Sequence, residues 1–245
     1  DEGRRAKWHI EVRLSEEPHW GVLGTAIGYK VIDQVPYVTG VDQWIGMEDG
    51  KPNPVAVGKL KAMGSASAAS GAVGLYHVEN VTPEAIDQGR GLLTDDHQTY
   101  VIDDAELARV RATFPNHWKD PKGDPNGVYI GCPHNTFEEM VYWCQRLHAA
   151  LKERGQDKLA VPVVLASASA VKDHLLDEHP LLFRDMVRAG VQFTNICTVV
   201  WMGLKGMADI ERGVTNSGKA RSYTNLRIYD DDHIVEIAMT GKAPY

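Results

Sequence analysis

Cysteine is scarce in this sequence, with three residues among 245. So small and odd a set does not support the disulfide framework of a small secreted domain. It is typical of proteins in a reducing compartment, and we therefore expect a cytoplasmic protein. Cys132, Cys144 and Cys197 then become candidates for metal ligation, for nucleophilic chemistry or for ordinary core packing.

Long apolar runs and an excess of positive charge are also absent. No apolar run approaches the roughly 20 residues that a membrane span needs, and the formal net charge is −7. A negative chain gains no electrostatic support for binding to phosphate backbones. We therefore expect neither nucleic acid nor a membrane among its partners. With 43% hydrophobic and 24% charged residues, the composition is that of an ordinary globular protein.

Strand-like and helix-like patterns alternate along the chain. This alternation predicts an α/β fold with open, mostly parallel, doubly wound sheets. The length of 245 residues is compatible with one large domain or two small ones. A polar stretch begins at Pro115, and we divide the chain near it into an N-terminal α/β portion, residues 1–120, and a C-terminal βαβ domain, residues 121–245.

Glycines are the notable feature of the N-terminal portion. Gly21, Gly24 and Gly28 fall on one face of a predicted helix, where each costs about 1 kcal/mol relative to alanine. Their common face indicates close packing against another element, with close approach of a substrate as the alternative. His77, near the end of a predicted strand, is interpreted either as a core histidine or as a ligand. Strands are predicted at 8–14, 35–40, 72–78 and 99–102, and helices at 19–30, 56–69 and 104–113.

The C-terminal domain has the more regular pattern. Its longest predicted helix, 136–154, opens with a capping box of Thr136 and Glu139. The apolar stripe of this helix includes Cys144, which is therefore predicted to be a core residue. Strands are predicted at 128–131, 161–166, 191–196 and, at the tail, 234–239.

Three βα units in succession place the carboxyl ends of their strands at one edge of a parallel sheet. Cys132, Ser167, Ser169 and Cys197 are predicted to lie at that edge. Two thiols are too few for a closed structural zinc site, but they suffice for an open catalytic metal that another residue or chain completes. Two alternatives stay open: a nucleophilic Cys132 paired with His134, and two buried structural cysteines.

A second candidate site lies at residues 213–223. It is typical of a strand-to-helix turn, and its backbone N–H groups, the hydroxyls of Thr215 and Ser217, and Lys219 suit a carboxylate or a phosphate. The spacing is not that of a Walker loop. An ordinary Ser/Gly helix start with a surface lysine is the alternative.

Four motifs resemble, in the same order, the large catalytic part of the aconitase X family. They are residues 70–77 with 82–85, then 131–134, then 194–197, and then 215–219. The resemblance runs from about Trp20 to Tyr223 and implies an aconitase-like fold. It also implies an iron-dependent hydro-lyase, with iron present as an iron–sulfur cluster or as a single ion. Cys132 and Cys197 resemble the metal-ligand positions of the family.

The resemblance also implies roles for the polar residues of these motifs. His134 is expected to carry a proton, since histidine exchanges protons near neutral pH. Ser217 and Lys219 are expected to act in catalysis by holding the substrate carboxylate. The expected substrate-binding residues are Ser70, Gly71, His77, Thr215, Asn216, Ser217, Gly218 and Lys219.

The leading hypothesis is a dehydratase that removes water from a small hydroxy-carboxylate. Members of the family dehydrate cis-3-hydroxy-L-proline or mevalonate 5-phosphate, and the first is the expected substrate. The family also has a longer N-terminal part and a small swivelling domain or subunit. We therefore expect this chain, which begins at Asp1, to be part of a longer enzyme with such a partner. The alternative is a noncatalytic subunit that binds a small anion or a partner protein.

Overall fold

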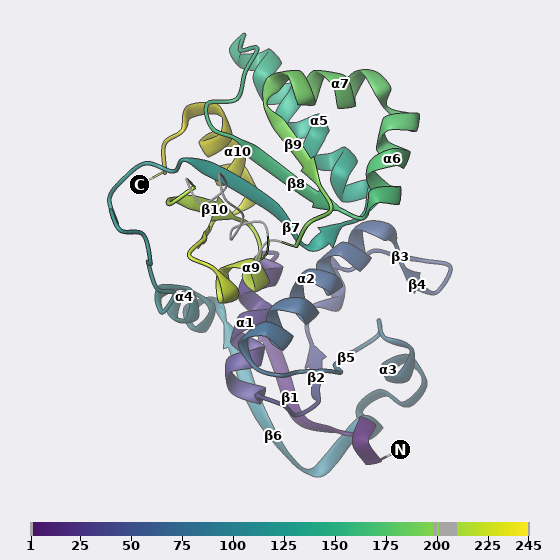
Figure 1. The fold of residues 1–245 in the computed structure, drawn as a ribbon. Helices are drawn as coiled ribbons and strands as arrows, with labels where there is room; N and C mark the ends of the chain where they lie inside the picture. The colour runs from purple at the N-terminus through teal and green to yellow at the C-terminus, as the bar shows by residue number, and fades with distance from the viewer. Residues whose placement is uncertain (1, 198–199, 201–209, 245) are drawn as a thin grey trace. The chain divides into compact units, whose positions relative to one another are not determined.

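The computed structural model describes residues 2–197, 200 and 210–244 (Figure 1). They fall into two compact units, Asp1–Pro115 (unit 1) and Asn116–Tyr245 (unit 2), each built on its own parallel sheet. The combination of helices with parallel sheets confirms the predicted α/β class. In the described part of the chain, no helix has both the length and the apolar character that crossing a membrane requires.

Unit 1 is built on a four-stranded sheet in the order β5-β2-β1-β6, with all strands parallel. Every second residue of β1 is buried, and Trp8, Ile10 and Val12 pack into the core that the helices cover. The strands are β1 (Ala6–Arg13), β2 (Pro36–Thr39), β5 (His77–Val78) and β6 (Leu93–Asp103), and a separate hairpin pairs β3 (Met47–Glu48) with β4 (Lys51–Pro52).

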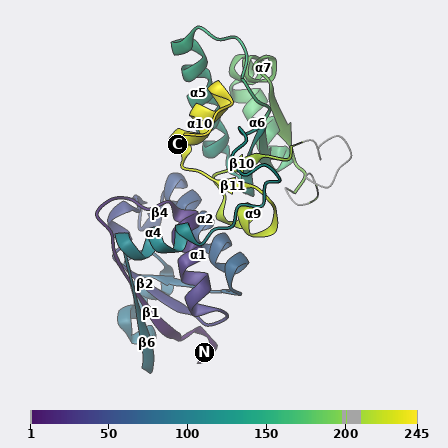
Figure 2. The ribbon, with the colours of Figure 1, turned by 90° about the vertical axis from the view of Figure 1, so that its left-hand side faces the viewer.

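Helices α1 and α2 lie on one face of this sheet (Figure 2). The glycine face of α1 is their contact surface. A Cβ atom on Gly24 would lie 2.1 Å from the Met63 carbonyl oxygen, and one on Gly28 would lie 2.6 Å from that of Ser67. Close helix packing is therefore confirmed as the reason for Gly24 and Gly28. The helices are α1 (Trp20–Val31), α2 (Pro54–Ser70), α3 (Pro83–Gln88) and α4 (Asp104–Ala112), with 3-10 turns η1 (Glu2–Arg4), η2 (Asp42–Trp44) and η3 (Gly89–Leu92).

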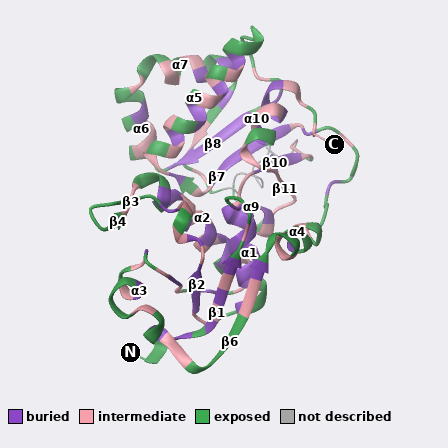
Figure 3. Cartoon of the chain, turned by 180° about the vertical axis from the view of Figure 1, so that it is seen from behind, coloured by how far each residue is buried: buried purple, intermediate pink, exposed green. Residues whose placement is uncertain are grey.

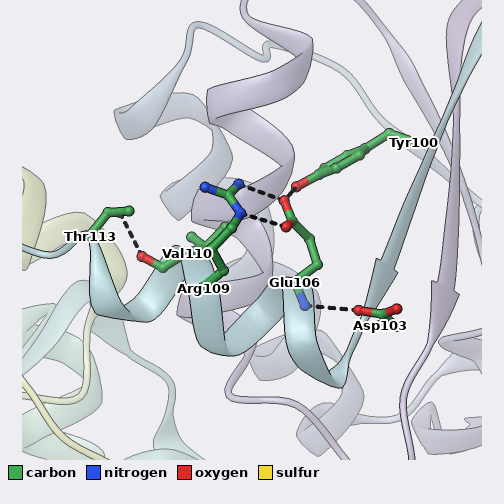
Figure 4. A network of polar contacts seen from close by, with 6 residues as sticks. All are labelled: Tyr100, Asp103, Glu106, Arg109, Val110 and Thr113. Carbon is green, nitrogen blue, oxygen red and sulfur yellow. Dashed lines mark hydrogen bonds and ion pairs between the residues drawn. The ribbon is translucent and has the colours of Figure 1, made fainter.

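A polar network ties the start of α4 to β6 (Figure 4). The Asp103 side chain caps the helix by accepting the Glu106 N–H at 2.8 Å. Glu106 in turn accepts hydrogen bonds from the Tyr100 hydroxyl and from Arg109, whose Nε lies 2.6 Å from Glu106 Oε2. The Arg109 hydrogen bond is the main cause that lowers the pKa of Glu106 to about 2. The carboxylate therefore stays charged well into the acidic range.

Unit 2 contains a five-stranded parallel sheet in the order β11-β10-β7-β8-β9. Successive residues of β7 point to opposite faces, so Val128 and Ile130 join the larger core cluster and Tyr129 joins a smaller one. Figure 3 shows β7 and β8 as the buried centre of this sheet. The strands are β7 (Gly127–Asn135), β8 (Val163–Ser167), β9 (Val191–Thr194), β10 (Gly213–Thr215) and β11 (Arg227–Ile228).

The longest helix of unit 2 forms as the sequence predicts. The capping box is present, with the Glu139 N–H donating to Thr136 Oγ1 at 3.2 Å. Cys144 is fully buried, and burial raises the pKa of its thiol to about 12. This thiol is therefore a core group and not a reactive one. The helices are α5 (Phe137–Arg154), α6 (Ser169–Glu178), α7 (Pro180–Ala189), α9 (Gly218–Tyr223) and α10 (Asp231–Thr240).

The predicted strand at 234–239 is wrong, because this segment belongs to helix α10. Ile234, Ile237 and Ala238 are spaced i, i+3, i+4 and bury one face of that helix in the larger core cluster. A run of six residues is too short for this period to be separated from strand alternation. Acidic residues at the start, Asp231 and Asp232, are the helix signal that the prediction did not use.

Two predicted strand boundaries also differ from the structure. Strand β7 does not stop before Cys132 but continues to Asn135, with a register irregularity between Ile130 and Asn135. The predicted strand at 72–78 is reduced to β5, since β2 pairs there only through Tyr37 and Val38. The first difference places Cys132 inside the irregular part of a strand rather than after its end.

Candidate active site

The carboxyl edge of the unit 2 sheet gathers most of the predicted site residues. Because the strands are parallel, the ends of β7, β8, β9 and β10 lie along one edge. Strand β7 lies between β10 and β8, so the Cys132 segment has the 215–219 loop on one side and Ser167 on the other. Cys197 follows β9.

Gly131 allows the backbone to turn just before Cys132. Its φ of +113° lies in a region that side chains rarely adopt, and a Cβ atom there would lie 2.3 Å from the Ala166 carbonyl oxygen. The Asn135 side chain donates to that same oxygen at 2.9 Å. The peptide bond between Cys132 and Pro133 is cis. The irregular end of β7 is thus held against β8 by backbone and side-chain contacts.

The 215–219 loop is the predicted strand-to-helix turn, and Ser217 organises it. The Ser217 hydroxyl accepts the Ala220 N–H at 2.9 Å and so caps α9. The same hydroxyl donates its proton to the Cys132 carbonyl oxygen. The Ser217 N–H donates to the hydroxyl of buried Thr215 at 3.1 Å. With its proton committed to Cys132, Ser217 positions the Cys132 segment and has only a lone pair left to offer.

Lys219 and His134 differ in what surrounds them. Lys219 is half-buried in α9 and forms no ion pair with any residue in the described part of the chain. A half-buried cation without a partner suits an anionic ligand. His134 is exposed near the end of β7, directly before buried Asn135.

The two remaining cysteines are accessible, unlike Cys144. Cys132 is half-buried against the smaller core cluster, and Cys197 is exposed. The alternative of two buried structural cysteines is therefore wrong. Strands two positions apart are spaced roughly 10 Å. Cys132 lies in β7, and Cys197 follows β9, the strand two positions away in the sheet.

A metal centre needs more donors than these two. Within residues 2–197, 200 and 210–244, no group of three or more His, Cys, Asp or Glu side chains is arranged to hold a metal. Two accessible thiols still fit part of a soft-ligand shell, which iron in clusters prefers. The other ligands would have to come from outside the described residues.

The predicted substrate residues of unit 1 already have structural partners. Ser70 Oγ donates to the Ala66 carbonyl oxygen at 2.7 Å. Gly71 ends α2, and a Cβ atom on it would lie 2.5 Å from the Gly28 carbonyl oxygen. His77 is fully buried, with Nε2 2.8 Å from the Arg4 carbonyl oxygen. These contacts favour the core interpretation of His77 and a packing role for the other two.

Asp231 is a polar residue of this region that sequence reasoning missed. Its carboxylate accepts a hydrogen bond from Asn216 of the 215–219 loop at 3.0 Å. The usable signal was an acidic residue in the first turn of a helix, which assignment of the tail as a strand concealed.

Comparison with known proteins gives relatives over almost the whole chain. A family profile described as the aconitase X second domain matches residues 6–112. The phosphomevalonate dehydratase large subunit of Thermococcus kodakarensis is 29% identical, over 97% of this chain and 56% of that protein. Its counterpart from Methanothermobacter thermautotrophicus is 31% identical, over 57% of this chain and 31% of that protein.

A solved structure agrees with these relatives. The crystal structure of Thermococcus kodakaraensis aconitase X in its holo-form is 27% identical in sequence, with a TM-score of 0.72. The match covers 100% of this chain and 56% of that one. The matches cover nearly all of this chain. The chain itself spans about half the length of those proteins.

Proposed function

We propose that this chain forms part of a hydro-lyase, because residues 6–112 match the profile of the aconitase X second domain and the whole chain is similar to aconitase X. The reaction is the removal of water from a small hydroxylated carboxylate. The observation that carries the proposal is the similarity to dehydratase large subunits across 97% of the chain, which includes both accessible cysteines.

The names of the relatives direct the choice of substrate. They are phosphomevalonate dehydratases, which favours a phosphorylated hydroxy acid. The cyclic hydroxy acid cis-3-hydroxy-L-proline is the second candidate. Both substrates carry a carboxylate and a hydroxyl on a neighbouring pair of carbons, and they differ in the phosphate and the ring nitrogen.

Iron is the proposed cofactor, as a cluster or a single ion, and Cys132 and Cys197 would hold it. When bound, it supplies a Lewis acid for the departing hydroxyl. Lys219 attracts the anionic end of the substrate. Ser217 keeps the Cys132 backbone in place through its hydrogen bond to the Cys132 carbonyl oxygen. His134, exposed near the end of β7, carries a proton between the substrate and solvent.

A partner is part of the proposal. The relatives are described as large subunits, which implies a small subunit in those enzymes. We expect the same kind of small, swivelling partner here, either as a separate chain or as another part of this one. The competing proposal is a noncatalytic subunit that binds a small anion through Lys219 and holds no iron.

The test measures iron, acid-labile sulfide and dehydration on the complete enzyme, purified without oxygen. Both mevalonate 5-phosphate and cis-3-hydroxy-L-proline are assayed. Cys132→Ser and Cys197→Ser are each expected to lose iron and to lose activity by at least a hundredfold. Cys144→Ala is the matched control. The Cys144 thiol is buried in the core, so this substitution is expected to leave the iron content unchanged.

Two results would contradict the proposal. Iron retained in both Cys132→Ser and Cys197→Ser would remove these residues from the metal site. A wild-type enzyme with its partner present that dehydrates neither substrate and holds no iron would favour the anion-binding subunit instead.

A further inference from the structure

The Asn216 side chain in the 215–219 loop is fixed in one orientation. Its Nδ2 donates to Asp231 Oδ1 at 3.0 Å. An ionised carboxylate can only accept hydrogen bonds, so the amide nitrogen and not the amide oxygen must face Asp231. Asn216 and Asp231 are both half-buried, where a mispaired polar group would be costly.

Asp231 is itself held from α5. The Tyr142 hydroxyl donates to Asp231 Oδ2 at 3.3 Å, and Arg146 donates to that hydroxyl at 2.6 Å. Arg146 also binds Asp232, the next residue of α10. Both oxygens of the Asp231 carboxylate are therefore engaged, and the carboxylate cannot rotate away from Asn216 without losing a hydrogen bond.

The consequence is an acceptor with no partner. With Nδ2 turned to Asp231, Asn216 presents its Oδ1, which accepts no hydrogen bond from any residue that the structure describes. An amide oxygen needs a donor such as a hydroxyl, and it repels a carboxylate or a phosphate. Lys219, three residues further on, is the group in this loop that suits an anion. The loop thus offers an acceptor and a cation within one turn of the chain.

We propose that Asp231 is a positioning residue that aims Asn216 Oδ1 at the hydroxyl of the substrate, so that the loop selects hydroxylated acids over their deoxy analogues. This inference rests on the proposed function, since it names the substrate hydroxyl as the group that the 215–219 loop of that site contacts. Asn216 contacts the substrate, whereas Asp231 acts only through Asn216. A single neutral hydrogen bond at a half-buried site is expected to change affinity about tenfold.

The experiment measures dissociation constants by calorimetry on the complete enzyme. Two ligand pairs are used: mevalonate 5-phosphate with its 3-deoxy analogue, and cis-3-hydroxy-L-proline with L-proline. Wild type is expected to bind the hydroxylated member of one pair more tightly than its deoxy partner by about tenfold or more, because the proposed iron and Asn216 both favour the hydroxyl. Asp231→Ala lets the Asn216 amide rotate, so this preference is expected to fall about tenfold from its wild-type value, while affinity for the deoxy analogue stays within about twofold.

Three further variants separate positioning from general damage. Asp231→Asn retains an oxygen that can accept the Asn216 N–H, so it is expected to keep most of the preference. Tyr142→Phe removes the hydrogen bonds of this hydroxyl with Asp231 and Arg146 but leaves the pair of Asn216 and Asp231 intact, so it is the matched control and is expected to have a small effect. Asn216→Ala is expected to lower the preference by the same factor as Asp231→Ala, and adding Asp231→Ala to it is expected to change nothing more.

Each outcome decides between two ideas. If Asp231→Ala weakens the hydroxylated and deoxy ligands equally, Asp231 has only a structural role and this inference fails while the proposed function stands. If wild type binds none of the four ligands, the proposed function fails and takes this inference with it. A preference that keeps its wild-type value in Asn216→Ala also overturns the inference, because Asn216 would then not contact the hydroxyl.

Discussion

The predicted site residues of unit 1 and unit 2 differ in what the fold already does with their polar atoms. In unit 1, the Ser70 hydroxyl donates to a backbone carbonyl oxygen and His77 is buried with a ring nitrogen bound to Arg4. In unit 2, Lys219 forms no ion pair within the described residues, and Cys197 is exposed. The hydroxyl of Ser70 is therefore already used inside unit 1, whereas the charge of Lys219 in unit 2 is not paired with any described residue.

This difference teaches that a residue type at a favourable position is only half of a site. The other half is hydrogen-bonding capacity or charge that the fold leaves unused. Ser217 shows the distinction within unit 2, since its hydroxyl already donates a hydrogen bond to the Cys132 carbonyl oxygen. The proton of Ser217 is thus already used inside the unit, whereas the charge of Lys219 is not paired with any described residue.

The largest expected effect is on stability, when the packing of α1 against α2 in unit 1 is disturbed. Gly24→Ala would place a methyl group 2.1 Å from the Met63 carbonyl oxygen, and a backbone oxygen cannot move aside easily. Overpacking of this kind is expected to lower the free energy of unfolding by about 3 kcal/mol. The measurement is denaturant unfolding together with hydrogen exchange at the α1 amides.

Gly74→Ala is the matched control in the same unit. A Cβ atom there meets nothing within 4 Å, so stability is expected to stay within about 0.5 kcal/mol of wild type. If Gly24→Ala proved as mild as this control, close packing would not explain the glycines of α1, and approach of a substrate would again need consideration.

The second effect is on ligand binding. Lys219→Met removes a half-buried cation that forms no ion pair with any described residue, and it is expected to weaken binding of the anionic substrate about thirtyfold, the equivalent of about 2 kcal/mol. Ser70→Ala in unit 1 is the contrasting variant, and it is expected to leave affinity unchanged because its hydroxyl is bound to the backbone. Calorimetry with both variants gives the comparison directly. A larger loss of affinity in Ser70→Ala than in Lys219→Met would mean that unit 1, and not unit 2, supplies the polar groups that bind the substrate.

The third effect combines stability and function. Ser217→Ala removes the cap of α9 and the tie to Cys132, and it is expected to cost about 1 kcal/mol of stability together with activity. Thr136→Ala removes the cap of α5 and is expected to cost about the same stability with activity intact. Unfolding and turnover measured on both variants test this. Equal activity in the two would show that Ser217 does no more than cap a helix.

Much of the fold could be predicted from local patterns. Helix α5 has both a capping box and a long apolar stripe, and several turns of consistent signal leave little ambiguity. The prediction of a strand at 234–239 was wrong because six residues satisfy strand and helix periods alike. Only packing against the sheet decides between the two. The predicted strand at 72–78 is longer than β5, because the length of a strand depends on how many residues of the neighbouring strand pair with it. That neighbour, β2, lies far away in the sequence.

The candidate site could be predicted only in part for a related reason. Parallel topology places Cys132 and Cys197 on one edge, and this follows from the order of strands and helices alone. The contacts of Ser217 with Cys132 and of Asn216 with Asp231 join residues that no local pattern relates. The sequence likewise could not reveal that the hydroxyl of Ser70 is used inside its own unit.

The smallest effect concerns pH and the network of unit 1 in Figure 4. The folded-state pKa of Glu106 is about 2, below its ordinary value of 4.5, chiefly because Arg109 donates to the carboxylate. A lowered pKa means that the stabilisation is complete above about pH 4.5 and is lost as the pH falls towards 2. Glu106→Gln cannot ionise, so its stability difference from wild type is expected to shrink across this window. Because Arg109 is exposed, the change should be smaller than the loss of one helix cap. Unfolding midpoints of both proteins across the window measure it, and a constant difference would mean that the Glu106 charge contributes nothing to holding α4 on β6.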